Sequence, residues 1–184
     1  MVLTLELFRE NFKPYPVPRL LEHLLAFQNT SRDHYSWGFE LARLPQDELR
    51  DHVVPEAISQ FFCFGHDGTY SLYALWRYKE IPLDEAPVVY FNAEAEGSGV
   101  LASTLLEFLT LLALDKEPNL GKYEVGGLGI GPSPRNQELR DWLELHYGLH
   151  AAEEPNAIVQ RARSQYPALP LLYPAAERSH PGHH

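Results

Sequence analysis

Two aromatic-rich runs joined by a short turn constrain the fold of this chain more than any other feature. The runs span residues 57–64 and 69–78, and Gly65, His66, Asp67 and Gly68 connect them. Glycine at both ends of a short connection can supply the positive φ angles that hairpin turns often need. Side chains alternate across a strand, so one face of the second run would carry Tyr70, Leu72, Ala74 and Trp76, and the other face Ser71, Tyr73, Leu75 and Arg77. The segment predicts an antiparallel β-hairpin.

The sequence before the hairpin predicts one helix, one strand and one short charged helix. Apolar residues in 17–27 recur at the spacing of a single helix face. Residues 35–41 alternate between aromatic or apolar and smaller or polar side chains, which is typical of a strand with one buried face. A short helix is expected within 45–54, with Leu49 and Val53 pointing inward.

The sequence after the hairpin again contains both strand-like alternation and helix-like spacing of apolar residues. A strand is expected at 87–92 and a helix at 100–114. A loop or edge strand follows around 122–125. Two further helices are expected, the first over 133–148 with Ser133 as N-cap and with Leu139, Trp142 and Leu143 buried, the second over 155–166, followed by an irregular tail at 167–184.

This order of elements predicts one α+β domain with a mainly antiparallel sheet and helices packed on it. A chain of 184 residues has the size of one ordinary domain, and 45% hydrophobic with 22% charged residues is a globular composition. We expect the domain to cover 1–184, with its central part at about 55–115.

Net charge and cysteine content indicate which kinds of partner the protein can bind and in which cellular compartment it works. A net charge of -10 repels the phosphate backbone, so nucleic acid is a poor candidate partner. Cys63 is the only cysteine and cannot form an internal disulfide, which indicates a reducing compartment. Glu6 and Glu10 do not fit a secretory signal, and the apolar run at 105–114 is too short to span a bilayer. We therefore expect a cytoplasmic protein without a membrane partner.

Negative charge is concentrated between Asp84 and Glu117. This stretch contains one basic residue, Lys116, and seven acidic residues, so its net charge is -6. The acidic residues are Asp84, Glu85, Glu94, Glu96, Glu107, Asp115 and Glu117. If the loops that carry them lie at one end of the sheet, their carboxylates would steer a basic partner. The alternative is a solvated face that serves solubility.

The central segment resembles the core signature of the SUKH superfamily, which includes the yeast cell-wall-assembly-regulator type. The shared features are a Phe-rich strand with a Gly-Asp-Gly turn, a strand that ends in a bulky aromatic, a Pro-Val-Tyr-Phe strand, an acidic glycine loop and a helix; they map onto 62–68, 70–76, 87–91, 94–99 and 102–109. The N-terminal segment 36–49 departs from the family pattern.

The resemblance implies an α+β domain that acts by binding another protein. Many bacterial members of the family are immunity proteins that neutralise a toxin, so a basic toxin is the expected partner. The expected partner-binding residues are Asp67, Asp84, Glu85, Glu94, Glu96 and Tyr73. Tyr73, Tyr78 and Tyr90 are the candidate aromatic contacts, although burial is expected for at least two of the three. The alternative implied by the resemblance is a regulatory scaffold related to cell-wall assembly.

No motif in the sequence predicts a catalytic, cofactor or metal site. Cys63 lies in an apolar strand, where a thiol is usually inert. His66 beside Asp67 places a base next to a carboxylate, and a small hydrolase that uses them is the weaker alternative. The glycine run 126–131 lacks the spacing of a nucleotide-binding loop. Three histidines at 180–184 could capture a metal ion only on a loose tail. We therefore predict a non-enzymatic protein.

Overall fold

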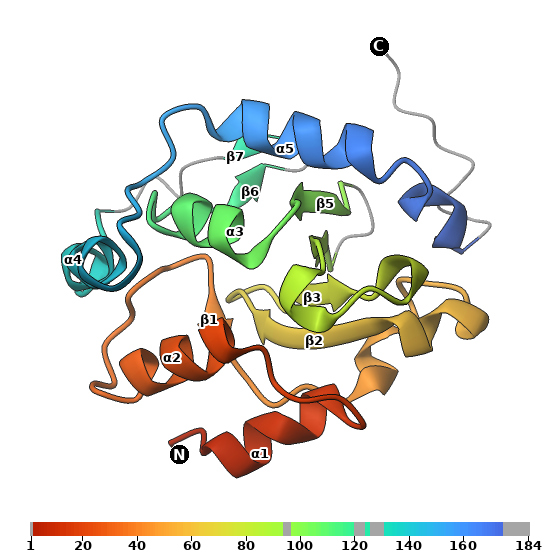
Figure 1. Cartoon of the computed structure of the whole chain (residues 1–184), viewed down its shortest axis with the longest axis horizontal. Helices are drawn as coiled ribbons and strands as arrows, with labels where there is room; N and C mark the ends of the chain where they lie inside the picture. The colour runs from red at the N-terminus through yellow and green to blue at the C-terminus, as the bar shows by residue number, and fades with distance from the viewer. Residues whose placement is uncertain (1, 94–96, 120–123, 126–130, 175–184) are drawn as a thin grey trace.

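Five antiparallel strands form the central sheet in the order β1-β2-β3-β4-β5 (Figure 1). The strands are β1 (Glu40–Leu41), β2 (Phe61–His66), β3 (Leu72–Trp76), β4 (Val88–Phe91) and β5 (Gly99–Ala102). The computed structural model describes residues 2–93, 97–119, 124–125 and 131–174. Each strand pairs with the next one along the chain, so the sheet is a meander. The predicted α+β class and antiparallel sheet are confirmed.

Helices cover both faces of this sheet. The α-helices are α1 (Leu5–Arg9), α2 (Arg19–Gln28), α3 (Leu105–Leu112), α4 (Asn136–Tyr147) and α5 (Pro155–Gln165). Short 3₁₀ segments are η1 (Glu10–Phe12), η2 (Gln46–Leu49), η3 (Pro55–Gln60), η4 (Tyr78–Glu80), η5 (Leu83–Glu85) and η6 (Leu169–Leu172). A separate two-stranded ribbon pairs β6 (Pro118–Asn119) with β7 (Glu124–Val125), within the region where an edge strand was expected.

The alternation of side chains on β3 divides the core into two clusters. Tyr73 and Leu75 join the cluster that contains buried residues of α1, α2, α3 and α4. Leu72, Ala74 and Trp76 join the cluster on the other face, with buried residues of η2, η3 and η6. Every residue of β3 is buried, because the sheet is packed on both sides.

The hairpin β2–β3 is confirmed, but its turn differs from the expected one. His66 still belongs to β2, and the connection therefore spans 67–71. Neither Gly65 nor Gly68 has a positive φ, whereas Tyr70 does (φ 67°) and is 81% exposed. Tyr70 therefore does not share the buried face of Leu72 and Trp76.

The helix predicted for 100–114 is wrong over its first residues. Gly99–Ala102 forms β5, which pairs with β4, and α3 begins only at Leu105. Thr104 is the N-cap, and its hydroxyl accepts a hydrogen bond from the Glu107 N–H. Glu107 in turn accepts the Ser103 N–H at 2.9 Å, so the capping residues fix the boundary between strand and helix.

Three smaller expectations also need correction. Of the strand expected at 35–41, only Glu40 and Leu41 pair with β2. Arg135 is the N-cap of α4 in place of Ser133, whose hydroxyl donates to Asp115 at 2.8 Å. Part of the tail is ordered as η6, with Leu169 buried. Leu49 and Val53 are fully buried, as predicted.

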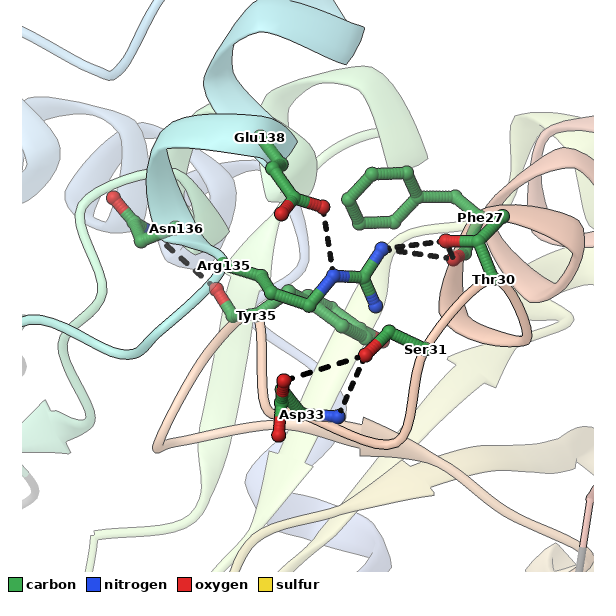
Figure 2. A network of polar contacts seen from close by, with 8 residues as sticks. All are labelled: Phe27, Thr30, Ser31, Asp33, Tyr35, Arg135, Asn136 and Glu138. Atoms are coloured by element: carbon green, nitrogen blue, oxygen red, sulfur yellow. Dashed lines mark hydrogen bonds and ion pairs between the residues drawn. The ribbon is translucent and has the colours of Figure 1, made fainter.

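Arg135 joins the start of α4 to the end of α2 (Figure 2). Its guanidinium donates to the Thr30 hydroxyl at 2.6 Å, to the Phe27 carbonyl at 3.3 Å and to Glu138 at 2.8 Å. It also lies over the Phe27 ring, 4.7 Å from the centroid. The side chain is 3% exposed, so this contact holds two helices together inside the core.

Candidate protein-binding surface

The two acidic connections expected to act together start from opposite ends of β4. Asp84 and Glu85 belong to the connection from β3 to β4, whereas Glu94 and Glu96 belong to the connection from β4 to β5. Successive connections of an antiparallel meander leave the sheet at alternate ends, and β4 separates these two by roughly 14 Å, at about 3.4 Å per residue. The bases of the two connections therefore lie at opposite ends of β4 and are not side by side.

Asp67 is a buried structural residue of the hairpin turn and not a surface contact. It is 3% exposed. Oδ1 accepts hydrogen bonds from the Thr69 N–H at 2.8 Å, the Thr69 hydroxyl at 2.7 Å and the Ser71 N–H at 3.0 Å. Oδ2 accepts the Tyr90 hydroxyl at 2.7 Å. The predicted role of Asp67 in partner binding is wrong, because its carboxylate is used to hold the turn against β4.

Tyr73 is also excluded from partner binding by burial. It is 2% exposed and its hydroxyl donates to the Gly38 carbonyl at 2.8 Å. Tyr90 is 2% exposed, and burial raises the pKa of both phenols. Tyr78 is only partly buried. Burial of at least two of the three tyrosines is therefore confirmed, and the predicted contact role of Tyr73 is corrected.

Asp84 and Glu85 are exposed, as a contact surface requires. Asp84 Oδ1 accepts the backbone N–H of Arg19, the first residue of α2, at 3.2 Å. A carboxylate at this position satisfies one free N–H of the helix and interacts favourably with its dipole. Asp84 therefore has a structural role, and Glu85 remains available to a partner.

Glu94 and Glu96 lie outside the described residues, although the ends of their loop are described. The Asn92 N–H donates to the Ser98 hydroxyl at 3.0 Å, and the Ala93 N–H donates to the Ser71 hydroxyl at 3.2 Å. Ser71 is itself bound to Asp67. The base of this loop is therefore attached to the hairpin turn.

A further set of exposed carboxylates lies on η2, η3 and the segment between them. This acidic segment consists of Asp47, Glu48, Asp51 and Glu56, all of them exposed. Only Asp47 has a basic partner within ion-pair distance in the described part of the chain, Arg50 at 3.6 Å. The sequence predicts a short charged helix here but does not single it out as a binding site. The signal that could have found it is four acids against one arginine within 47–56.

Packing fixes the acidic segment to the sheet. Leu49 and Val53 are fully buried in the cluster beneath it. η3 ends where β2 begins, and Phe61 at that start pairs with Trp76 at the end of β3. The Arg77 N–H donates to the Gln60 carbonyl at 2.8 Å. The acidic segment and the connection that carries Glu85 therefore both leave the sheet at this end.

The polar groups considered for catalysis have structural surroundings. Cys63 is 1% exposed, and burial raises the pKa of its thiol. His66 Nδ1 is 2.8 Å from the Asp67 carbonyl, to which it donates as the Nδ1–H tautomer. His52 is not one of these groups, but it is also partly buried. Burial lowers the pKa of its imidazole, and the negative charge of Asp51 partly offsets this shift.

The part of the chain that the structure describes has neither a metal-binding cluster nor a membrane-spanning helix. No group of three or more His, Cys, Asp or Glu side chains there is arranged to hold a metal ion. No helix in those ranges combines the length and the apolar character needed to cross a bilayer. The histidines at 180–184 and residues 126–130 of the glycine run lie outside the described residues.

Comparison with protein-family models, with curated proteins and with solved structures finds no match for this chain. We therefore infer its function from its own residues and their arrangement.

Proposed function

We propose that this chain is a non-enzymatic, cytoplasmic protein-binding module of SUKH type, an immunity protein that neutralises a basic toxin by direct binding. The observation that carries the proposal is the acidic segment, whose carboxylates are exposed while Leu49 and Val53 anchor it in the core. The connection that carries Glu85 starts at the same end of the sheet, so Glu85 adds a further exposed carboxylate there.

The physical basis of binding would be electrostatic complementarity on a rigid support. Glu48, Asp51 and Glu56 have no cation within ion-pair distance among the described residues, so their charge is not compensated locally. Carboxylates of this kind accelerate association with a cationic partner and orient it, more than they raise the final affinity. If the toxin is a basic nuclease, the acidic segment would occupy the surface that otherwise binds nucleic acid.

Charge reversal at the acidic segment tests the proposal. The double variant Glu48→Lys/Asp51→Lys would be compared with Asp141→Lys/Glu144→Lys on α4, which carries the same charge change beyond the other face of the sheet. Co-expression with basic toxins would measure protection, and stopped-flow mixing would measure association. We expect the first variant to lose protection and to associate at least about tenfold more slowly, while the α4 variant behaves as wild type.

Two outcomes contradict the proposal. The first is that no basic toxin is neutralised by the wild-type chain. The second is that both double variants protect as well as wild type. Recovery of resident cell-wall regulators from the native cell, in place of a foreign effector, would favour the regulatory scaffold instead.

A further inference from the structure

A pocket of about 570 Å³ lies at the end of the sheet where β2 begins and β3 ends. Its lining comes from the segment after η1, from η2 and η3, and from the residues that follow β3; it includes Lys13, Tyr15, Gln60, Arg77, Lys79 and Glu80. Binding sites for small molecules usually have volumes of roughly 300 to 1,000 Å³. The pocket therefore has room for a metabolite-sized ligand.

The guanidinium of Arg77 is held in place by stacking and not by hydrogen bonds. It lies over the Tyr15 ring, 4.4 Å from the centroid, and Tyr15 packs edge-to-face on Phe62 at 5.5 Å. The Arg77 side chain is 24% exposed. Its one polar partner among the described residues is Glu80, at 3.8 Å, which is beyond hydrogen-bond distance. The N–H groups at the edge of the guanidinium are therefore available to a ligand.

Two further cations make this pocket positive within an acidic protein. Lys79 lies over the Tyr78 ring at 5.0 Å and has no carboxylate within ion-pair distance in the described part of the chain. Lys13 pairs with Glu10 at 2.8 Å. Together with Arg77 they gather three cations around one cavity, whose lining carries one carboxylate, Glu80, while Glu10 pairs with Lys13. The lining is therefore net positive, although the chain as a whole carries a net charge of -10. Such a cavity attracts anions from solution.

The backbone that presents Arg77 and Lys79 is in a costly conformation. Lys79 (φ 49°) and Glu80 (φ 61°) are consecutive non-glycine residues in the left-handed region. Non-glycine residues in that region are strained and persist where the surrounding structure enforces them, often at ligand sites. The strained turn lies on the wall of the pocket, which is consistent with a ligand site.

We propose that this pocket binds a small molecule that carries a carboxylate or phosphate group, with the Arg77 guanidinium as the recognition group. The planar edge of a guanidinium matches two oxygens of either oxyanion, and its stacking on Tyr15 fixes the direction in which it donates. Lys79 adds a second positive charge at the same oxyanion. This site differs from the acidic segment, because it would take an anion while that segment takes a cationic protein.

Titration with inorganic phosphate and with citrate tests the proposal, and their relative affinities identify the preferred oxyanion. Binding would be followed by the Arg77 Nε–Hε resonance and by the backbone amides of 77–80 in two-dimensional NMR, with ionic strength held constant by sodium chloride. We expect saturable shifts confined to pocket residues with at least one probe. Arg77→Gln should weaken binding by about tenfold or more, since it removes a charge-assisted hydrogen-bonding group.

Arg50→Gln is the matched control. Arg50 also pairs with a carboxylate three residues away, Asp47 at 3.6 Å, but it does not line the pocket. It should bind the probes as wild type does. Lys79→Gln, at an exposed position, provides a second variant that does not disturb packing and should weaken binding about threefold. Absence of saturable shifts with both probes, or equal binding by Arg77→Gln and Arg50→Gln, would overturn the proposal.

Discussion

Tyr90 donates its hydroxyl to Oδ2 of Asp67 across 2.7 Å, and both side chains are buried. This bond joins β4 to the turn between β2 and β3. It explains how a carboxylate can be buried in this turn without an ion-pair partner among the described residues, since the four hydrogen bonds that it accepts replace its hydration.

Replacement of Asp67 tests this account. Asp67→Ala leaves four donors without an acceptor, so we expect a loss of about 3 kcal/mol in the free energy of unfolding. Tyr90→Phe removes only one of these bonds and should cost about 1 kcal/mol. Urea unfolding followed by tryptophan fluorescence measures both. A smaller loss for Asp67→Ala than for Tyr90→Phe would contradict the network.

Gly65 and Gly68 flank the same turn and should respond differently to alanine. A Cβ on Gly65 would meet the Phe39 ring and lie 2.8 Å from the Glu40 carbonyl oxygen, whereas a Cβ on Gly68 would have nothing within 4 Å. We expect Gly65→Ala to cost about 2–3 kcal/mol, since overpacked sites must shift their backbone.

Gly68→Ala is the internal control for Gly65→Ala. It should change the melting temperature little, because its φ is not positive and its surroundings are open. Equal shifts in the melting temperatures of the two variants would show that the turn needs glycine for backbone freedom, and not for the close approach of Phe39.

The spacing of apolar residues predicts those helices and strands that depend mainly on neighbouring residues in the sequence. The hairpin and α2 were found because alternating and helical patterns are unambiguous there. β5 was missed because Val100 and Leu101 fit a helical spacing as well as a strand, and only pairing with β4 decides between them. A polar turn between glycines is usually exposed, so the local sequence favours a surface position for Asp67. The residue that buries its carboxylate, Tyr90, lies 23 residues away.

The charge of the candidate surface was visible in the sequence, but its arrangement was not. A count of acids between Asp84 and Glu117 treats neighbours in the chain as neighbours in space. The antiparallel order of β3, β4 and β5 sends successive loops to opposite ends, so Glu85 shares its end of the sheet with the acidic segment at 47–56 instead. The strand order alone would have revealed this.

Arg135 should be far more important for stability than other arginines of this chain. Arg135→Lys keeps the charge but cannot donate at once to Thr30, Phe27 and Glu138, so we expect a loss of about 2–4 kcal/mol. Arg161→Lys is the control, because the Arg161 side chain is 57% exposed and its ion pair with Glu107 contributes about 1 kcal/mol or less. Thermal unfolding of the two variants measures the difference, and similar melting temperatures would contradict the role of Arg135.

Glu117 should make the protein less stable as pH rises through the titration range of this carboxyl. Burial, and then the negative charge of Asp67, raises its pKa from the ordinary 4.5. The folded state therefore binds a proton more tightly than the unfolded chain, so Glu117 subtracts stability once it is ionised. His52 acts in the opposite sense, because burial lowers its pKa and its protonation disfavours the folded state as pH falls.

Glu117→Gln separates these two contributions. Glutamine keeps the shape of the side chain that packs against Gly38 and removes the charge. At pH 7 we expect the variant to be more stable than wild type by less than about 1 kcal/mol, as is usual for a partly exposed charge. The difference should disappear when pH falls below 4.5, the ordinary pKa of the group, because wild-type Glu117 is then protonated. Urea unfolding between pH 4 and pH 7 measures it, and a variant that is less stable than wild type at pH 7 would show that the ionised carboxylate is favourable where it lies.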